Sequence, residues 1–327
     1  MAARARRRRS GRLVRSVVVG YLDTPAGHDA LALGTALAHT LGVRLDLVMV
    51  LHDQGRASLV PTAPSYERHL DDLADGWLQE AAAEIPAGVT STTHLVRAET
   101  FAEGLVAAAA DLEADAIVIG AGKEGTLGRL HLGSVGGVLV HSARVPVAIA
   151  PAGFAERGVR SFGSVTAAVG TRAGARAVVD TAVATAAAAR VPLRLVSLVP
   201  LDSVGDGERR DRDDRERALH DEAREHAERM RDIALDGVPA DLDVTVEIAP
   251  GPRIADAIDA LTWGDDELAL VGSSRLAQPR RLFLGSVAAK IVRGVPVPLV
   301  VVPRDHDART TWTGVAPGGA HPEGTTP

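Results

Sequence analysis

The sequence contains no cysteine among its 327 residues, and only 3% of them are aromatic. The absence of cysteine excludes disulfide bonds, thiolate metal sites and cysteine nucleophiles. No apolar run reaches the roughly 18 residues of a membrane-spanning helix, and the stretch from Val14 to Leu22 is interpreted as a strand rather than a signal-peptide core. We therefore expect a cytoplasmic protein without a metal or redox cofactor.

The core must be built from Ala, Val, Leu and Ile, because 46% of the residues are hydrophobic while few are aromatic. That composition suits helices packed on a parallel sheet, so the predicted class is soluble α/β. The formal net charge is −6, with both signs interspersed, which gives no electrostatic reason for the folded body to bind nucleic acid. The length fits two domains of about 150 residues each.

The chain repeats itself. A shift of 152 residues brings the same residues together in the same order, while nearer the start of each unit the shift falls to 147, as loop insertions would produce. The matches are Gly120 with Gly272, Gly133-Ser134-Val135 with Gly285-Ser286-Val287, Pro146 with Pro298, and Pro151 with Pro303. We predict a basic tail over residues 1–13, two like domains over 14–153 and 160–304, and a flexible tail over 305–327.

Hydrophobic periodicity predicts five strands alternating with four helices in each unit. Crossover helices between strands imply two doubly wound domains, each a five-stranded parallel sheet flanked by helices, with the ligand crevice at the carboxyl ends of the strands. The expected strands cover residues 16–20, 45–51, 89–96, 116–120 and 147–150, then 165–169, 193–199, 244–248, 268–271 and 299–302.

Two charged segments lie outside this pattern. Arg4 to Arg9 predict a solvated basic arm, with weak polyanion binding as the alternative. Residues 206–232 are dense in both charges, but their apolar residues fall at helical spacing. They predict one exposed helix with ion pairs four residues apart.

The fourth strand of each unit ends in a glycine, and thirteen residues later Gly-Ser begins the next helix. The segments IVIGAGKEGTLGRLHLGSV and ALVGSSRLAQPRRLFLGSV, followed by VPVAIAP and VPLVVVP, resemble the universal stress protein family, whose phosphate loop follows G-x2-G-x9-G-[S/T]. The likeness covers the chain from about Val14 to Pro303. It implies a tandem, stress-response regulatory protein of the adenine-nucleotide alpha-hydrolase-like fold, with ATP as the candidate ligand.

By this resemblance the two glycine-rich loops form the candidate nucleotide site. Glycine lets backbone N–H groups approach an anion, and a helix N-terminus offers unpaired N–H groups to phosphate. The alternative is that Ser134 and Ser286 merely cap the last helix of each unit. The candidate residues are Gly120, Gly122, Lys123, Gly133, Ser134, Val135, Gly272, Arg275, Gly285, Ser286 and Val287.

The loops depart from the family pattern at two points. The second glycine of the motif is replaced by Lys123 in one unit and Arg275 in the other, and either side chain could add charge to the phosphates or obstruct them. ATP-binding members carry an Asp near the adenine after the first strand. Alignment places Leu22 and Val169 there, although Asp23 is adjacent.

Three classes of function therefore stay open. The Gly-Ser helix starts favour a nucleotide-binding regulator, with the first unit preferred because its loop keeps more glycine. The replaced positions favour an interaction protein without nucleotide. An ATP-hydrolysing enzyme has least support, since we can place no catalytic or metal site. The resemblance also implies that the fifth strands of the two units pair within the chain as a pseudo-dimer, and it allows a further homodimer. We expect no nucleic-acid or membrane partner.

Overall fold

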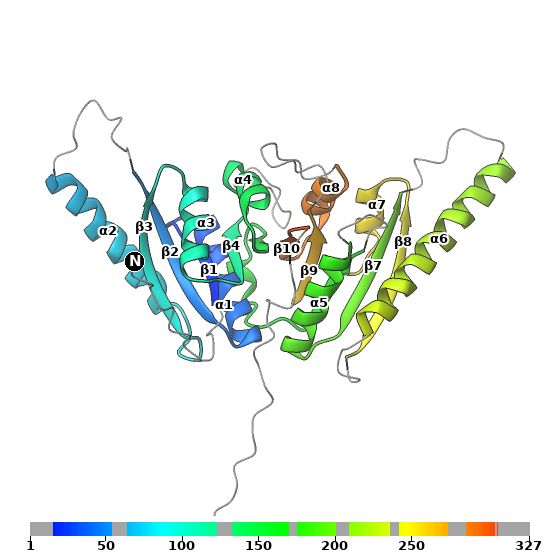
Figure 1. Cartoon of the computed structure of the whole chain (residues 1–327), viewed down its shortest axis with the longest axis horizontal. Coiled ribbons are helices and arrows are strands. Elements are labelled where there is room, and N and C mark those ends of the chain that lie inside the picture. Colours follow the sequence, from blue (N-terminus) through cyan, green and yellow to red (C-terminus); the bar gives the residue numbers. More distant parts are fainter. Residues whose placement is uncertain are drawn as a thin grey trace, which may run out of the picture.

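The computed structural model describes residues 16–53, 64–122, 133–169, 175–200, 209–235, 242–273, 286–304 and 306. In Figure 1 these residues form two halves that stand side by side, each with strands at its centre and helices outside. None of the described helices is long and apolar enough to cross a membrane.

The first half follows the predicted order of elements. Its first helix begins where Thr24 accepts a hydrogen bond from the Gly27 amide and Pro25 fills the first helical position, and it ends at Gly42, whose φ of 63° is left-handed. The elements are β1 Ser16–Gly20, α1 Pro25–Leu41, β2 Arg44–His52, α2 Pro64–Ala83, β3 Ser91–Ala98, α3 Phe101–Asp111, β4 Ala116–Gly120, α4 Ser134–Ser142 and β5 Val147–Ala150.

The second half repeats this order. One difference is its third helix, which has 6 residues where α3 has 11. The elements are β6 Ser164–Ala168, α5 Ala175–Ala189, β7 Leu193–Pro200, α6 Arg209–Leu235, β8 Val244–Gly251, α7 Ile254–Asp259, β9 Glu267–Gly272, α8 Ser286–Gly294 and β10 Leu299–Val302, and a short 3-10 helix, η2 Ala155–Arg157, lies between the halves.

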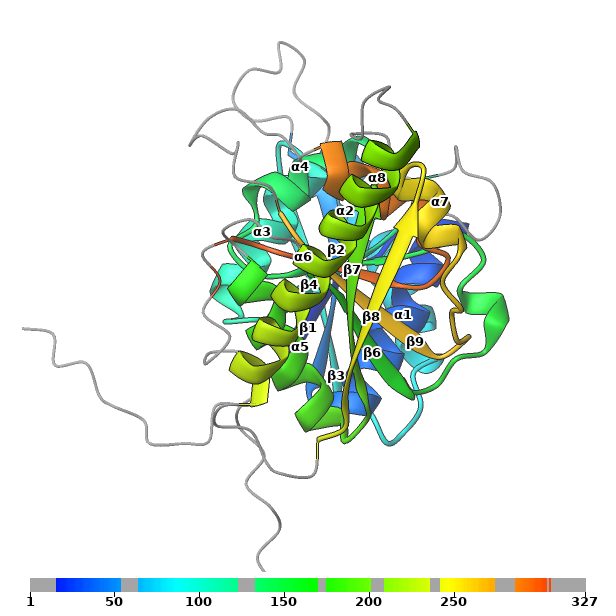
Figure 2. The ribbon, with the colours of Figure 1, turned by 90° about the vertical axis from the view of Figure 1, so that its right-hand side faces the viewer.

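The charged helix α6 is less exposed than predicted. Ala227 is fully buried, and Met230 packs against the core, because the apolar stripe of the helix covers the sheet. Figure 2 shows α6 in front of the sheet, beside strand β8. Glu225 and Arg229 form a predicted pair four residues apart, at 3.5 Å, whereas Asp214 and Arg217 pair at a spacing of three.

The two halves share one ten-stranded sheet, in the order β3-β2-β1-β4-β5-β10-β9-β6-β7-β8. Neighbouring strands within each half are parallel. Strands β5 and β10 run antiparallel, with Ala148 opposite Val300. This confirms the prediction that the fifth strands meet inside one chain. The pairing covers two strand edges that would otherwise be open.

Each face of the sheet carries a hydrophobic core that continues from one half into the other. Side chains alternate along a strand, so Val17 lies in the core under α1, α2 and α5, while Val18 lies in the core under α3, α4 and α8. Ala150 and Val300 meet in the first core, and Leu299 joins the second. The halves are therefore joined by packing on both faces as well as by the β5–β10 pairing.

The segment between the halves is held by α1. Phe154 is fully buried and Phe162 is 4% exposed, and the Phe162 amide donates to the Thr40 hydroxyl at 3.0 Å. On the other side, the Arg157 guanidinium donates to the carbonyl of Pro296 at 3.0 Å. The connection is thus a packed part of the interface between the halves.

Two charged clusters lie near the amino ends of the strands. In the first half, the fully buried Asp46 carboxylate accepts two hydrogen bonds from Arg44, at 2.9 and 2.8 Å. It also contacts Thr92 and, at 3.1 Å, His94. In the second half, Arg194 forms the centre of the corresponding cluster.

The second cluster has the opposite charge at matching places in the sheet. Arg194 bonds Glu267 at 2.7 Å and Glu247 at 2.9 Å. Strand register makes Arg194 the counterpart of Asp46, and Glu247 the counterpart of His94. Each cluster joins an edge strand to its neighbour. The charges at matching positions are reversed between the two halves, but both halves have this link between the strands.

Candidate functional site

The predicted loops gather where β1 and β4 end side by side. From this point β1 continues through α1 to β2, whereas β4 leads through α4 to β5 on its other side. Such a reversal in strand order is where open α/β sheets bind ligands, at the carboxyl ends of the strands. We call residues 20–24, 120–122 and 133–135 the β1–β4 site.

Gly120 is required by packing at this site. A Cβ atom on Gly120 would stand 1.9 Å from the carbonyl oxygen of Ala26, in the first turn of α1. Backbone cannot yield to such an approach, so glycine lets α1 begin directly against the end of β4. The sequence places Gly120 among the candidate phosphate-binding residues, and its spacing alone does not reveal this packing role.

Gly122 and Gly133 bring the two ends of the predicted phosphate loop together. A Cβ atom on Gly133 would lie 3.6 Å from the Cα atom of Gly122, which is an ordinary contact. Gly133 is the N-cap of α4, and Ser134 is its first helical residue; no side-chain hydrogen bond caps this described helix start. Ser134 therefore does not cap α4, contrary to the alternative interpretation. The N-terminal amides of α4, including those of Ser134 and Val135, therefore lie beside Gly122 and Gly133, whose backbones carry no side chains.

The loop after β1 is fixed by α1. The Leu22 carbonyl accepts the Thr24 amide at 2.7 Å, and a Cβ atom on Gly27 would stand 1.8 Å from the same oxygen. This contact holds the Leu22 carbonyl against the first turn of α1. Leu22, which the sequence alignment places where ATP-binding relatives are expected to have Asp, is 41% exposed.

Asp23 is directed to α1. Its carboxylate lies 3.2 Å from Nε2 of His28, and Nδ1 of His28 is 3.9 Å from Glu84 at the end of α2. The His28 ring also packs edge-on against Tyr21, with centroids 5.7 Å apart. Burial, followed by the charges of Asp23 and Glu84, raises the pKa of Tyr21 to about 12. This part of the site is therefore negatively charged.

Sequence reasoning missed the contact between Asp23 and His28. A signal was present, because Asp23 immediately precedes the N-cap Thr24 and His28 is the fourth helical residue, two positions that meet at helix starts. Among the described residues, no group of three or more His, Asp or Glu side chains is placed to hold a metal ion.

The second half corrects the pairing of Val169 with Leu22 that the sequence alignment gave. The Val169 amide bonds the carbonyl of Val196 at 2.8 Å, as the Tyr21 amide bonds that of Val48 at 2.9 Å, so Val169, which is 3% exposed, matches the buried Tyr21. The residue that follows Val169, which matches Leu22, lies outside the described residues. Gly272 ends β9, and Ser286 and Val287 begin α8, as predicted. Lys123, Arg275 and Gly285 lie outside the described residues.

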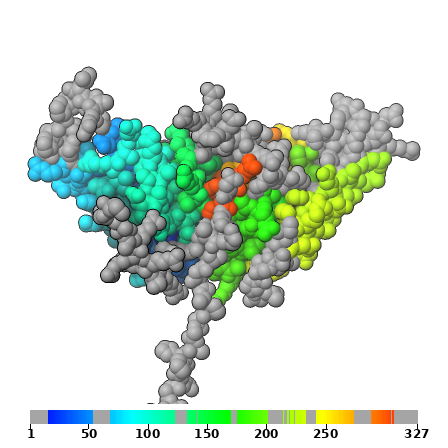
Figure 3. All heavy atoms as spheres, viewed as in Figure 1, coloured from blue at the N-terminus to red at the C-terminus, as the bar shows by residue number. Residues whose placement is uncertain are grey.

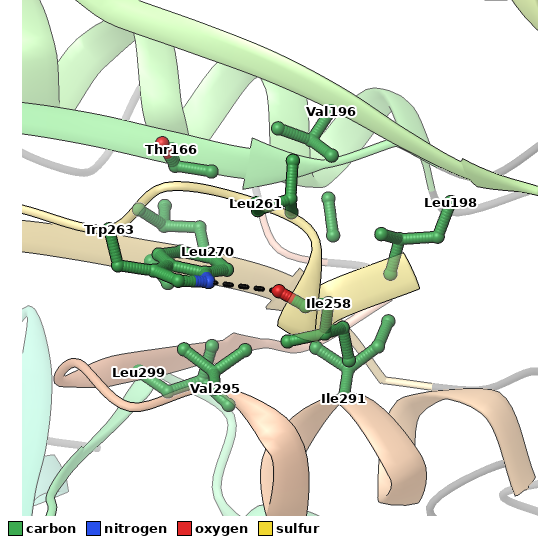
Figure 4. Close-up of a pocket in the computed structure, with 12 residues that line it drawn as sticks. Thr166, Val196, Leu198, Ile258, Leu261, Trp263, Leu270, Ile291, Val295 and Leu299 are labelled. Atoms are coloured by element: carbon green, nitrogen blue, oxygen red, sulfur yellow. Dashed lines mark hydrogen bonds between the residues drawn. The ribbon is translucent and has the colours of Figure 1, made fainter. Parts of the chain in front are cut away.

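A pocket in the second half lies away from these loops. It lies beneath Trp263, whose indole N–H donates to the Ile258 carbonyl at 3.2 Å (Figure 4). Apolar side chains such as Leu261 and Ile291 line it, and its space is little more than a water molecule occupies. It is too small for a nucleotide and reflects packing around the short α7.

Comparison with known proteins gives one family for both halves. The sequence matches the Universal stress protein family over residues 14–151 and again over 161–303. Universal stress proteins of Mycobacterium bovis and Mycobacterium tuberculosis are 28% identical to it over 305 residues, which cover 88% of this chain and 99% of each relative. A crystal structure of a universal stress protein from Archaeoglobus fulgidus has a TM-score of 0.61 at 18% identity, covering 89% of this chain and 99% of that one. The chain belongs to the universal stress protein family, with two tandem copies of the family fold.

Proposed function

We propose that this tandem universal stress protein is a cytoplasmic stress-response regulator, with domains over residues 14–153 and 160–304, whose first domain binds ATP at the β1–β4 site. The observation that carries the proposal is the start of α4. There Gly133 lies against Gly122, and the first amides of the helix have no side-chain cap among the described residues. A helix N-terminus with bare backbone around it favours phosphate oxygens.

The described residues of the site favour binding over turnover. Within residues 20–24, 120–122 and 133–135, Asp23 is the one carboxylate, and it pairs with His28. A general base must reach the proton that it removes, and Asp23 is held toward α1 instead. We therefore propose a nucleotide that is held as a signal. The first domain is preferred because its loop keeps more glycine, at Gly122, Gly125 and Gly128.

The test is equilibrium binding of labelled ATP to the full chain, with and without a divalent cation. Gly133 has φ −57° and ψ 178°, a conformation open to any residue, so a substitution there need not strain the backbone. We expect Gly133→Ala to bind within a few-fold of the wild type. Gly133→Val should abolish binding because its branched side chain blocks the approach of phosphate to backbone, while Gly285→Val should matter less. Unchanged melting temperatures would separate lost binding from lost fold.

A second function is an interaction module without nucleotide. It is favoured by two exposed apolar side chains on this half, Leu22 at 41% and Val138, on α4, at 42%. Contiguous exposed apolar surface marks contact sites for other proteins. If the wild type, Lys123→Gly and Arg275→Gly all fail to bind ATP, the interaction function replaces the nucleotide function.

A further inference from the structure

Helix α2 carries an exposed row of side chains in addition to its buried face. Ala74, Leu78 and Ala81 face the core. Leu73 and Trp77, each 40% exposed, continue into Glu80 at positions i, i+4 and i+7, which lie along one side of a helix, and Glu84 follows directly after the end of α2. We call these four residues the α2 row.

Contacts on the two flanks of α2 show which way the α2 row faces. On one flank, Asp71 pairs with Arg97 of the edge strand β3 at 2.5 Å. On the other, Glu84 lies 3.9 Å from His28 of α1. The α2 row contains Glu84 and therefore lies on the flank toward α1, away from the edge of the sheet.

The position in the fold does not require this exposed apolar pair. Helix α6 occupies the matching place at the opposite end of the molecule (Figures 1 and 3). On α6, Met230 is partly buried against the core, and the described outer surface carries charged residues such as Asp221, Glu222 and Glu228. Among the residues whose side chains the structure describes, such an exposed apolar pair is found on α2 and not on α6.

The end of the chain that precedes β1 starts close to α2. Ser16 begins β1 opposite Arg44, and the next residue of β2, Leu45, lies opposite Ser91, where the chain from α2 enters β3. Ser16 is therefore two strands, about 10 Å, from the start of β3, which the chain enters eight residues after the end of α2. The fifteen residues before Ser16 can extend roughly 50 Å, whereas a helix of the length of α2 measures about 30 Å.

Charge and apolar surface both match this segment. Residues 1–15 contain seven arginines and no acidic residue, and they include Leu13 and Val14. The α2 row itself carries exposed carboxylates at Glu80 and Glu84. Arginine pairs with carboxylates and also stacks on an exposed indole ring, which the α2 row supplies in Trp77.

We propose that the arginine-rich arm, residues 4–15, docks along the α2 row of its own chain, with arginines against Glu80, Glu84 and the Trp77 ring. Docking covers the exposed apolar pair and neutralises the acidic face of α2. It also withholds the arm from other polyanions, whose phosphates or sulfates would compete for the same arginines. The arm then becomes available when salt or a polyanion displaces it.

The test is digestion of the full-length protein with an arginine-specific protease at low salt, with loss of the arm followed by intact mass. In Glu80→Lys/Glu84→Lys, we expect cleavage in the arm to be at least about fivefold faster than in the wild type, because the row now repels it. About 0.5 M NaCl should accelerate the wild type similarly. The matched control is Glu222→Lys/Glu228→Lys, which adds the same charge on α6 and should behave as the wild type.

Binding of heparin, a polyanion probe, gives a second readout. The α2 variant should bind heparin several-fold more tightly than the α6 variant, although both carry the same net charge. A Trp77→Phe variant, which keeps an aromatic ring, should remain protected. Equal cleavage rates and equal heparin binding in the wild type, Glu80→Lys/Glu84→Lys and Glu222→Lys/Glu228→Lys would show a free, solvated arm and overturn the proposal.

Discussion

The carboxylate of Asp29, on α1, accepts a hydrogen bond from the amide of Ala155 at 2.8 Å, across 126 residues of sequence. Its second oxygen accepts the Gly153 amide at 3.0 Å. Asp29 is 4% exposed. A helix of the first half thereby fixes the start of the segment that leads to the second half, beside the fully buried Phe154.

We expect Asp29→Ala to lower the free energy of unfolding by about 3 kcal/mol, because two buried amides lose a charged acceptor. Asp29→Asn should cost less, since its carbonyl oxygen can still accept one bond. Asp180→Ala on α5, which breaks an exposed ion pair with Arg176, should cost about 0.5 kcal/mol or less. Urea unfolding checks all three; an unchanged midpoint for Asp29→Ala would contradict the role given to these bonds.

Glycines of the predicted phosphate loop should differ in what they tolerate. Gly120→Ala forces a methyl group to within 1.9 Å of the Ala26 carbonyl, and we expect it to cost roughly 1–3 kcal/mol or more. Gly133→Ala meets an ordinary contact at 3.6 Å and should be near neutral. Gly76→Ala, in α2 with open space around it, should stabilise by about 0.5–1 kcal/mol. Thermal unfolding of the three variants would reveal this order or refute it.

Asp46 should make the free energy of unfolding depend on pH in the acid range. Burial alone would raise the pKa of Asp46, but hydrogen bonds from Arg44, Thr92 and His94 outweigh it and lower the pKa from 3.8 to about 2. A carboxyl with a depressed folded-state pKa stabilises above its unfolded pKa, and this contribution is lost as the pH falls through the folded-state value. The advantage of the wild type over Asp46→Asn should therefore shrink by about 2 kcal/mol between about pH 5 and pH 2. Urea titrations at each pH measure it, and a constant difference would argue against it.

Substitutions of Lys123 should reveal whether its charge strengthens ATP binding or its side chain obstructs it. If its ammonium group contacts phosphate, Lys123→Ala should weaken ATP binding by a few-fold to tens-fold, in line with about 1.5–3 kcal/mol for a charged hydrogen bond, discounted for exposure. If its side chain obstructs the loop, Lys123→Gly should strengthen binding instead. Calorimetric titration with ATP distinguishes the two, and identical affinities in all three proteins would remove Lys123 from the site.

Leu22→Asp should increase the preference for adenine. The side chain is exposed, and the loop that carries it is fixed by the contact between Gly27 and the Leu22 carbonyl. A carboxylate there can accept a hydrogen bond from the amino group of adenine and would repel the corresponding oxygen of guanine, so the ratio of ATP to GTP affinity should rise about fivefold or more. The control is Leu73→Asp on α2, equally exposed, which should leave the ratio unchanged. An unchanged ratio of ATP to GTP affinity would show that the adenine base does not lie beside Leu22.

The sequence predicted the central strands well because each is an apolar run with both faces buried. The strands over 16–20, 116–120, 147–150 and 299–302 lie where they were expected. Helix starts were less accurate. The periodic residues begin at Ala30, whereas α1 begins at Pro25, since its start is set by the Thr24 cap rather than by the apolar stripe.

Contacts between distant side chains could not be predicted. The bonds of Asp29 depend on how the two halves pack, and the charged clusters depend on a register that sets Asp46 opposite Thr92. At the candidate site, the positions of Gly120 and Gly133 were predicted, but the separate reasons for glycine at each became visible only through their distances to Ala26 and Gly122.

The antiparallel pairing of β5 with β10 has a consequence for how this protein can change. In a homodimer that paired through the same strands, every substitution would be present in both subunits, once on each side of the interface. Here both sides are encoded in a single chain, so one side can be altered while the other stays as it was. The exchange of Asp46 for Arg194, and of His94 for Glu247, is a difference between partners that two identical copies could not have.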